Sequence, residues 1–210
     1  MSLWAIVPFK NLRGAKSRLG GALTAEERVG LTRGLLTHTL ELLVSAPLVD
    51  HTLLVSQDHE ALALARRLGA EPLVESGPPE LNRALTQAAA HAVTHGAGAV
   101  LVLPADLPLL TEAAIAQLCA QAAPPPVAVI APDRRQDGTN ALLLAPPGLI
   151  EYSFGTASYH RHLALARQAG GRLAICDLPG LALDLDSVED LDRLRAGSDS
   201  PPPHRPPNAA

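Results

Sequence analysis

Two lysines near the N-terminus stand out because the chain has so few of them. Lysine and arginine together number 17, and Lys10 and Lys16 are the two lysines among them. They share the stretch FKNLRGAKSRLGG with Arg13 and Arg18, so four cations fall within nine residues. A lysine ammonium is a compact point charge, which suits the binding of a polyphosphate. The stretch has neither the Walker A pattern nor the GxGxxG fingerprint. It therefore predicts a phosphate-binding loop of another kind or, as the alternative, a solvated basic loop.

Three aspartates offer oxygen ligands for a cation. Asp106 follows AVLVL, the most hydrophobic stretch of the chain, and a carboxylate at the end of a buried strand is well placed to bind magnesium beside nucleotide phosphates. Asp184 and Asp186 alternate in ALDLDSVEDL, and on a strand both carboxylates would point to one face. The alternatives are capping roles. Asp106 could cap a helix that begins near Thr111, and Asp186 could help Ser187 to cap the last helix.

Two turns rich in glycine and hydroxyl side chains could bind a small anion. In DGTNALLL, Thr139 directly precedes an apolar strand. In FGTASYHRHL, Gly155 and Ser158 precede a helix. Free backbone N–H groups at such a position attract a phosphate or a carboxylate. Ordinary helix capping by Thr156 or Ser158 is the alternative.

A protein nucleophile is missing from the sequence. There is no GxSxG motif, no Cys–His couple at a telling spacing, and no acid–base pair in an apolar setting. Phosphoryl and nucleotidyl transfer need no such group, because the attacking group is already an anion and the protein contributes positive charge, metal ligands and positioning. The absence therefore favours this reaction class.

The elements that must position these residues alternate along the chain. Apolar runs predict strands over 3–8, 52–56, 72–75, 99–103, 127–131, 141–145 and 172–176, with one more short strand in ALDLD. Helices are predicted over about 24–45, 59–68, 80–95, 111–122 and 158–169, followed by a last helix capped by Ser187. A capping box formed by Thr24 and Glu27 begins the first helix.

Strands that alternate with helices indicate an α/β fold, a three-layer α/β/α arrangement around a mainly parallel, mixed central sheet. The short connection between 127–131 and 141–145 predicts one antiparallel or irregular pairing. In such sheets ligands bind beyond the carboxyl ends of the strands, where the features above would gather. We expect one domain over 1–196 and a disordered, proline-rich tail over 197–210.

Composition excludes several function classes. The chain of 210 residues is 47% hydrophobic and 18% charged, with a net charge of -4. Its aromatic residues are one Trp, two Tyr and two Phe, which are too few for a base-stacking platform. We therefore expect no nucleic-acid or membrane partner. Cys119 and Cys176 have no CxxC spacing, which argues against a disulfide framework or a zinc site. Without a transmembrane run or a signal peptide, a cytoplasmic protein is expected.

Several motifs together resemble one family. The opening VPFKNLRGAKSRL is similar to the N-terminal signature of the guanylyltransferases of coenzyme F-420 biosynthesis, which act on 2-phospho-L-lactate or phosphoenolpyruvate. ELNRALTQA, LPADLPLL, DGTNALLL, FGTASYHRH and ALDLDSVEDL follow in the same order, so the resemblance covers about 1–196. This branch belongs to the fold of the nucleotide-diphospho-sugar transferases. The glycine-rich loop of the related molybdenum-cofactor branch is replaced here by PFKNLRGAKSR, which supports the F-420 branch.

The resemblance implies roles for individual residues. The residues at the GTP phosphates would be Lys10, Lys16, Ser17 and Arg18, and those near the nucleoside would be Leu81, Asn82 and Ala84. The phosphorylated three-carbon acid would be bound by Thr139, Gly155 and Ser158, and magnesium by Asp106 with Asp184 or Asp186. Lys16 and Asp106 would then be the catalytic residues.

The implied reaction transfers GMP from GTP to the phosphate of the acid and releases pyrophosphate. The acid could be phosphoenolpyruvate, 2-phospho-L-lactate or 3-phospho-D-glycerate, which the sequence does not distinguish. Two alternatives remain at this point: a sister nucleotidyltransferase of the molybdenum-cofactor type, using GTP or CTP, and a non-catalytic nucleotide-binding domain. Exposed leucines on two helices would also permit a homodimer.

Overall fold

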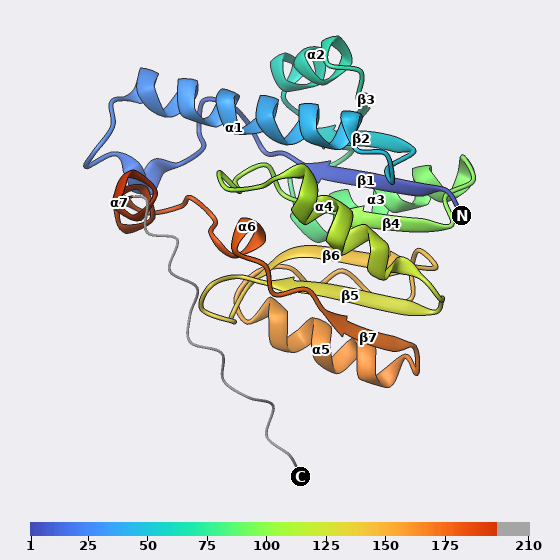
Figure 1. Cartoon of the computed structure of the whole chain (residues 1–210). Helices are drawn as coiled ribbons and strands as arrows, with labels where there is room; N and C mark the ends of the chain where they lie inside the picture. The colour runs from blue at the N-terminus through green and yellow to red at the C-terminus, as the bar shows by residue number, and fades with distance from the viewer. Residues whose placement is uncertain (197–210) are drawn as a thin grey trace.

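A seven-stranded sheet forms the centre of the molecule, in the order β3-β2-β1-β4-β6-β5-β7 (Figure 1). The computed structural model describes residues 1–196, so the predicted disordered tail lies outside the described residues. The strands are β1 (Leu3–Pro8), β2 (His51–Ser56), β3 (Glu71–Val74), β4 (Ala99–Val102), β5 (Val127–Pro132), β6 (Thr139–Ala145) and β7 (Arg172–Ile175). β6 runs antiparallel to β4 and β5, and the other pairings are parallel. The predicted mainly parallel, mixed sheet with one antiparallel element is confirmed.

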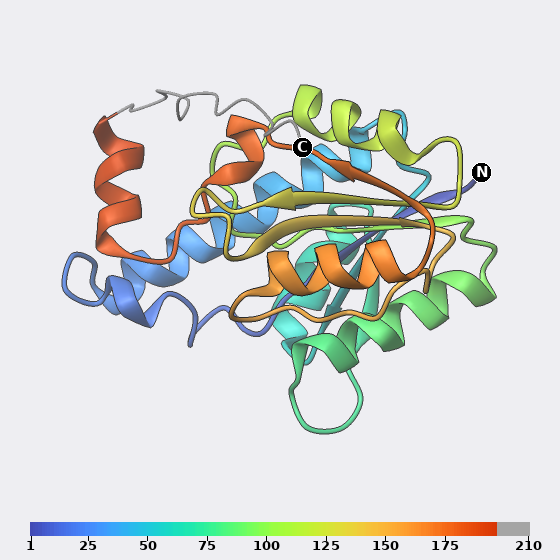
Figure 2. The same cartoon turned by 90° about the horizontal axis from the view of Figure 1, so that it is seen from below.

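Helices cover both faces of this sheet, which gives the three layers that the sequence predicts (Figure 2). The helices are α1 (Ala25–Ser45), α2 (His59–Arg67), α3 (Leu81–Thr94), α4 (Glu112–Cys119), α5 (Ser158–Gln168), α6 (Pro179–Ala182) and α7 (Val188–Ala196), with 3-10 turns η1 (Ser17–Leu19) and η2 (Ala120–Ala122). Side chains of α1, α2 and α4 pack on one face, and those of α3 and α5 pack on the other. Within residues 1–196, no helix is long and apolar enough to cross a membrane.

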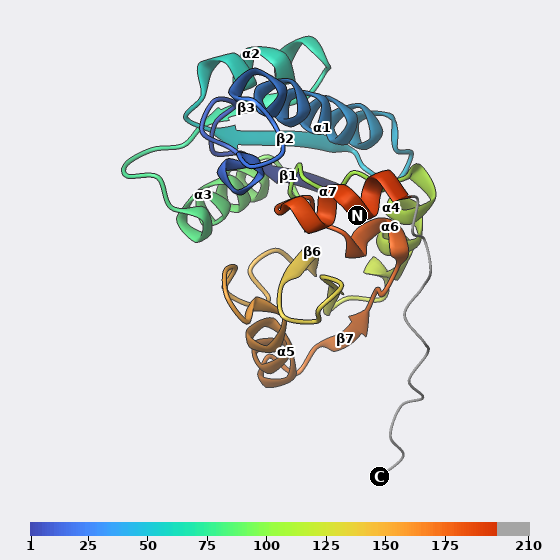
Figure 3. The same cartoon turned by 90° about the vertical axis from the view of Figure 1, so that its left-hand side faces the viewer.

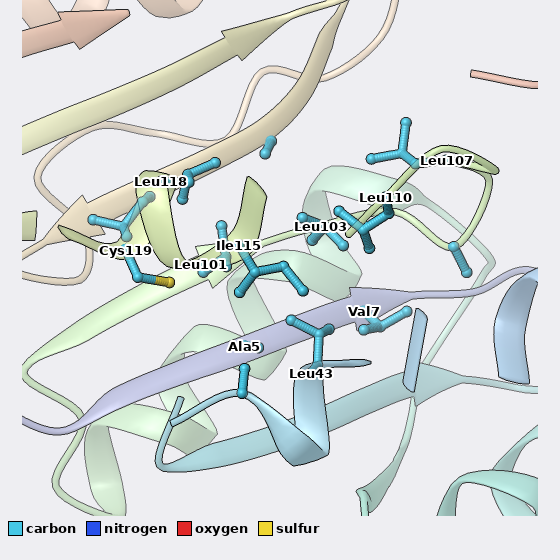
Figure 4. Packing of buried hydrophobic residues seen from close by; sticks show 14 of the residues in the cluster. Ala5, Val7, Leu43, Leu101, Leu103, Leu107, Leu110, Ile115, Leu118 and Cys119 are labelled. Carbon is cyan, nitrogen blue, oxygen red and sulfur yellow. The ribbon is translucent and has the colours of Figure 1, made fainter. Parts of the chain in front are cut away.

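The strand sequences explain why both faces are covered. Along β1, Ala5 and Val7 belong to the core on the α1 side, whereas Trp4 and Ile6 belong to the core on the α3 side. Figure 4 shows the first of these cores, where α4 residues pack against β1 and β4. A strand that is buried on both faces must be apolar at every position, which accounts for the continuous apolar run of residues 3–8.

The topology brings two loops together at one edge. The chain proceeds from β1 to β2 and β3 on one side, and then returns to place β4 on the other side of β1. The loops that follow β1 and β4 therefore meet at a topological switch point, which is the usual ligand-binding position in open α/β sheets. Figure 3 looks onto this carboxyl edge, where the loop after β1 and helix α7 lie in front of the strands. Because β6 is antiparallel, its first residue, Thr139, reaches the same edge.

The predicted short strand in ALDLD is wrong. After α6, residues 183–186 are extended but form no strand, although Leu183 and Leu185 are buried and the two aspartates between and after them are more exposed. The Leu185 N–H donates to the carbonyl of Asp106 at 3.0 Å rather than to a neighbouring strand. The segment crosses the edge of the sheet, so it has a buried side and an open side without having a strand partner.

Candidate active site

Lys16 joins two of the three predicted carboxylates. Its Nζ lies 2.8 Å from Oδ1 of Asp186 and 3.2 Å from Oδ2 of Asp106, and its side chain is only 8% exposed. Burial by itself would lower the pKa of the Lys16 ammonium, but the charges and hydrogen bonds of Asp106 and Asp186 outweigh it and raise the pKa above the ordinary value. The Lys16 ammonium thus binds Asp106 and Asp186, which lie 90 and 170 positions farther along the chain.

The loop after β1 is built to hold Lys16 in place. Lys16 has a left-handed backbone with φ 57° and precedes the turn η1. Leu12 and Leu19 on either side are buried, and the Leu12 N–H donates to Oδ2 of Asp58 at 2.8 Å. The other oxygen of Asp58 caps helix α2. Although it is basic and rich in polar residues, this part of the loop is anchored, and the alternative of a merely solvated loop does not describe it.

Asp106 is not a helix cap. Thr111 caps α4 by accepting a hydrogen bond from the Ala114 N–H at 3.2 Å. Oδ2 of Asp106 contacts Lys16, while its Oδ1 is buried and has no hydrogen-bond partner among residues 1–196. A buried carboxylate oxygen without a partner costs free energy unless a ligand satisfies it. This oxygen therefore points to a missing cation or hydrogen-bond donor.

The Asp186 carboxylate does not cap a helix either. Ser187 and Asp190 cap α7 reciprocally: the Asp190 carboxylate accepts from the Ser187 N–H at 2.9 Å, and the Ser187 hydroxyl accepts from the Asp190 N–H at 3.3 Å. The carboxylate of Asp186 is left for Lys16. Asp184 lies with Asp186 in the wall of a small polar cavity of about 110 Å³ that Arg18 also lines. Burial, together with the charges of neighbouring aspartates, raises the pKa of the Asp184 carboxyl.

The three aspartates fit a hard divalent cation that substrate phosphates help to bind. Among residues 1–196, no group of three or more His, Cys, Asp or Glu side chains lies so that it could hold a metal ion. Magnesium, however, is commonly held by one or two carboxylates together with substrate phosphates and water. The unpartnered Oδ1 of Asp106 and the carboxylates of Asp184 and Asp186 supply oxygen donors of the right kind. These donors support the predicted magnesium site.

A largely apolar cavity of about 350 Å³ opens beside the loop after β1. Leu81 and Ala84 of α3 line it, as the resemblance implies for residues near a nucleoside, and Phe154 forms another part of its wall. Leu81 is 42% exposed, which is unusual for a large apolar side chain and leaves an apolar surface for a ligand. Lys10 lines the same cavity at the end of β1. A planar base and the first phosphate of a nucleotide match these walls in size and polarity.

Asn82 differs from Leu81 and Ala84, because its side chain is used for hydrogen bonds within the protein. Its Oδ1 accepts a hydrogen bond from the Phe154 N–H at 2.7 Å, and its Nδ2 donates to the Phe154 carbonyl at 3.3 Å. Both ends of the amide are therefore used within the protein. Asn82 fixes Phe154 in the cavity wall, a role that spacing along the sequence does not indicate.

Thr139, Gly155 and Ser158 come together as predicted. The Thr139 N–H donates to Oγ of Ser158 at 2.9 Å, and the Ser158 N–H donates to the Gly155 carbonyl at 3.0 Å. Gly155 has φ 117°, a conformation that side-chain-bearing residues rarely adopt. The capping alternative is wrong, because Ala157 precedes α5 and no side chain caps the helix.

His162 completes this group, and sequence reasoning missed it. Its Nδ1 lies 2.9 Å from Oγ1 of Thr139, and its Nε2 accepts a hydrogen bond from the Ser153 N–H at 3.1 Å. The ring is fully buried, and burial lowers its pKa to about 4, with Arg161 adding to the effect. The available signal was the spacing of four between Ser158 and His162, which puts both on one face of α5.

The other predicted phosphate ligands lie at the same edge of the sheet. Ser17 begins the turn η1 directly after Lys16 and is exposed. Arg18 follows it and lines the polar cavity beside Asp184 and Asp186. Both side chains can reach solvent, so their contact with a nucleotide stays a prediction.

Comparison with known proteins identifies the family. The family "Guanylyl transferase CofC like" matches residues 3–200. A protein of Rubrobacter xylanophilus named phosphoenolpyruvate guanylyltransferase is 48% identical, over 93% of this chain and 95% of its own length. One of Methanothermobacter thermautotrophicus named 2-phospho-L-lactate guanylyltransferase is 34% identical, over 92% of this chain and 84% of its own length.

Among solved structures, the fold resembles a Desulfovibrio desulfuricans protein provisionally described as a nucleotide-diphospho-sugar transferase. The TM-score is 0.77 at 18% identity, with 95% of this chain and 90% of the other covered, which supports the fold alone. The family match extends over nearly all of the described chain and favours the F-420 branch over the molybdenum-cofactor branch. This chain belongs to the CofC-like guanylyl transferase family.

Proposed function

We propose that this protein transfers GMP from GTP to the phosphate group of phosphoenolpyruvate and releases pyrophosphate, as a step toward coenzyme F-420. The observation that carries the proposal is the meeting of Lys16, Asp106 and Asp186 at the sheet edge, next to a cavity with apolar walls. The family match and the name of the relative that is 48% identical support guanylyl transfer and this acceptor.

The reaction needs no nucleophile from the protein. An oxygen of the acceptor phosphate attacks the α-phosphorus of GTP, a new P–O bond forms, and the bond from the α-phosphorus to the β-bridging oxygen breaks. Pyrophosphate carries away the electron pair of that bond. Since the acceptor phosphate is largely dianionic at neutral pH, no general base is required. This agrees with a site that contains cations and carboxylates but no activated serine or cysteine.

Positive charge from the loop after β1 assists this step. The base would occupy the apolar cavity between Leu81 and Phe154, which leaves the phosphates near Lys10. Lys16 would hold the phosphate at which charge builds up as pyrophosphate leaves, and Ser17 and Arg18 would bind the outer phosphates. Donors that are fixed before the reaction stabilise such charge at little reorganisation cost.

Magnesium would be held by Asp106 together with Asp186 or Asp184. Bound there, it would neutralise the nucleotide phosphates and so permit a second anion to approach. Asp106 is the firmest of these ligands, because its Oδ1 is buried and lacks any other partner among residues 1–196.

The acceptor would lie against Thr139, Gly155 and Ser158. The Ser158 oxygen accepts from the Thr139 N–H, and no hydrogen bond donated by the Ser158 hydroxyl is found within residues 1–196, so that hydroxyl could donate to the acceptor. His162 is hydrogen-bonded to Oγ1 of Thr139 and keeps Thr139 in place, so its role here is to position Thr139. A second acceptor, 2-phospho-L-lactate, is favoured by the name of the relative that is 34% identical.

Pyrophosphate release from pairs of substrates tests the proposal. The purified protein would receive magnesium, GTP or CTP, and one of phosphoenolpyruvate, 2-phospho-L-lactate and 3-phospho-D-glycerate, with pyrophosphatase to draw the reaction forward. We expect release with GTP and phosphoenolpyruvate. Release with GTP and 2-phospho-L-lactate alone would reassign the acceptor, and release with CTP alone would overturn the guanylyl assignment.

A further inference from the structure

One charged side chain in the apolar cavity has no role in the reaction described above. Glu75 follows β3 directly and lines the cavity, yet its side chain is only 8% exposed. A carboxylate that is more than nine-tenths buried beside apolar walls needs hydrogen-bond donors.

One oxygen of Glu75 is already used. Oε1 accepts a hydrogen bond from the Glu80 N–H at 2.9 Å and lies 3.7 Å from Nη2 of Arg83. No hydrogen bond to Oε2 is found within residues 1–196. The carboxylate thus has acceptor capacity to spare where it meets the cavity.

Hydrogen bonds connect the loop that carries Glu75 to the end of β2 and to Gln57. The Glu75 N–H donates to the Ser56 carbonyl at 2.9 Å, and Nε2 of Gln57 donates to the Gly77 carbonyl at 2.7 Å. Gly77 has φ 73°, and a Cβ at this position would lie 2.7 Å from Nη1 of Arg83. A fixed acceptor can discriminate between ligands better than a mobile one, because it cannot move away from a mismatched group.

We propose that Glu75 selects guanine by accepting hydrogen bonds from N1–H and the 2-amino group of the base. The inference rests on the proposed function and assigns the base-reading residue within it. Guanine places two donors side by side on its Watson–Crick edge. Adenine and cytosine place a ring-nitrogen acceptor beside their amino group, and uracil flanks its single donor with carbonyl oxygens. Each of these would bring a lone pair against the carboxylate and leave Glu75 without its donors.

The proposal is tested by combining the substitution Glu75→Gln in the enzyme with XTP in place of GTP as the substrate. Xanthine carries a carbonyl where guanine carries the 2-amino group. In Glu75→Gln, Oε1 can still accept from the Glu80 N–H, while the amide nitrogen becomes a donor toward the base. We expect kcat/KM for GTP to fall by about 10- to 100-fold and kcat/KM for XTP to rise, so that the ratio of the two changes by more than about 100-fold.

Controls separate base reading from structural damage. Glu71→Gln makes the same chemical change at the other end of β3, where the side chain is 43% exposed and pairs with His91, and it should leave the ratio unchanged. If Glu75→Gln does not fold, wild-type protein with ITP, which lacks the 2-amino group, supplies the test: we expect kcat/KM about 10-fold or more below that for GTP.

The outcomes distinguish the two proposals. Wild-type protein that releases no pyrophosphate from GTP with any acceptor would overturn the proposed function and this inference with it. Normal turnover of GTP by the wild type, with an unchanged GTP-to-XTP ratio in Glu75→Gln or equal use of ITP and GTP, would overturn the assignment of Glu75 alone.

Discussion

At the scale of single residues, the site is organised by an ammonium group between two carboxylates. Lys16 offsets the charges of Asp106 and Asp186, which come from distant parts of the chain and would otherwise repel each other. An arginine could not replace this lysine without loss, because its planar guanidinium occupies more space and hydrogen-bonds in fixed directions. This gives a physical reason for a lysine at position 16 in a chain where most of the cations are arginines.

Asp106→Asn should reduce turnover by about 100-fold or more, because the change removes the charge that pairs with Lys16 and that would hold the proposed magnesium ion. The fold should survive, since Asp186 still pairs with Lys16. Pyrophosphate release gives the rate and thermal unfolding gives the stability. Asp192→Asn, at a side chain that is 68% exposed, is the matched control. Activity of Asp106→Asn within a few-fold of wild type would remove Asp106 from the catalytic site.

His162 should make the protein less stable as the pH falls. Its pKa in the folded protein is about 4, below the ordinary value of 6.5, because the ring is buried. The unfolded chain therefore binds a proton at a pH where the folded protein does not. The stabilisation is complete above about pH 6.5, is lost as the pH falls toward 4, and amounts to about 2 kcal/mol between pH 7 and pH 5.

Urea unfolding at pH 7 and pH 5 checks this value. His162→Gln keeps an acceptor for the Ser153 N–H but cannot take up a proton, so its stability should depend less on pH than that of the wild type by about 2 kcal/mol. The carboxylates contribute equally to both proteins and cancel in the comparison. An identical pH dependence in the two proteins would mean that His162 does not titrate as its burial indicates.

At the scale of elements, side chains behind the site hold its walls together. Asn82 connects the first turn of α3 to Phe154 through two hydrogen bonds. Asn140, on β6, donates to the carbonyl of Leu181 at 2.9 Å and so fixes the end of α6 before the Asp184–Asp186 segment. The apolar cavity therefore adjoins the Gly155 loop at Phe154, which lines the cavity and directly precedes Gly155.

Asn82→Ala should loosen this wall. We expect kcat/KM to fall by about 10- to 100-fold, mainly through higher KM values for both substrates, and the free energy of unfolding to fall by about 1–2 kcal/mol. Steady-state kinetics and urea unfolding measure the two effects. Thr86→Val is the matched control on α3, because it removes the hydrogen bond from Thr86 to the Asn82 carbonyl but leaves the Asn82 side chain intact. Unchanged KM values in Asn82→Ala would contradict the positioning role.

Apolar periodicity and cap residues predict most elements correctly, because they report local requirements. The run LWAIVP indicates a strand that is buried on both faces, and Thr24 with Glu27 marks the start of α1, where both hydrogen bonds of the capping box are present. Alternation in ALDLD indicates one buried side and one open side, and this pattern does not require a strand partner. Contacts between distant segments are not encoded in this way, which is why His162 and Glu75 escaped notice.

At the scale of the whole molecule, a leucine cluster joins the N-terminal loop to the C-terminal helix. Leu19 of η1, Leu35 of α1, Leu185 and Leu191 of α7 pack together away from the main core. Leu185 lies between Asp184 and Asp186 and is fully buried. The cluster therefore holds the loop of Lys16 and the segment of Asp186 against each other.

Leu185→Ala should affect activity more than its effect on stability implies. Loss of a buried leucine side chain lowers the free energy of unfolding by about 2–5 kcal/mol, and here it also releases Asp186 from Lys16. Leu36→Ala, in the main core and equally buried, should cost a similar free energy with little change in kcat at a temperature where both variants are folded. Equal kcat values in the two variants would show that the leucine cluster supports the fold but not the site.

The most direct test of the central claim follows the phosphorus atoms of GTP. The protein, magnesium and phosphoenolpyruvate would be incubated with GTP labelled at the α-phosphorus or, in a parallel sample, at the γ-phosphorus. The account predicts that the α-label appears in a new compound joined to the phosphate of phosphoenolpyruvate, while the γ-label appears in pyrophosphate. Label from the γ-position in an acceptor product, or release of the γ-label as inorganic phosphate with no α-labelled adduct, would contradict guanylyl transfer at this site.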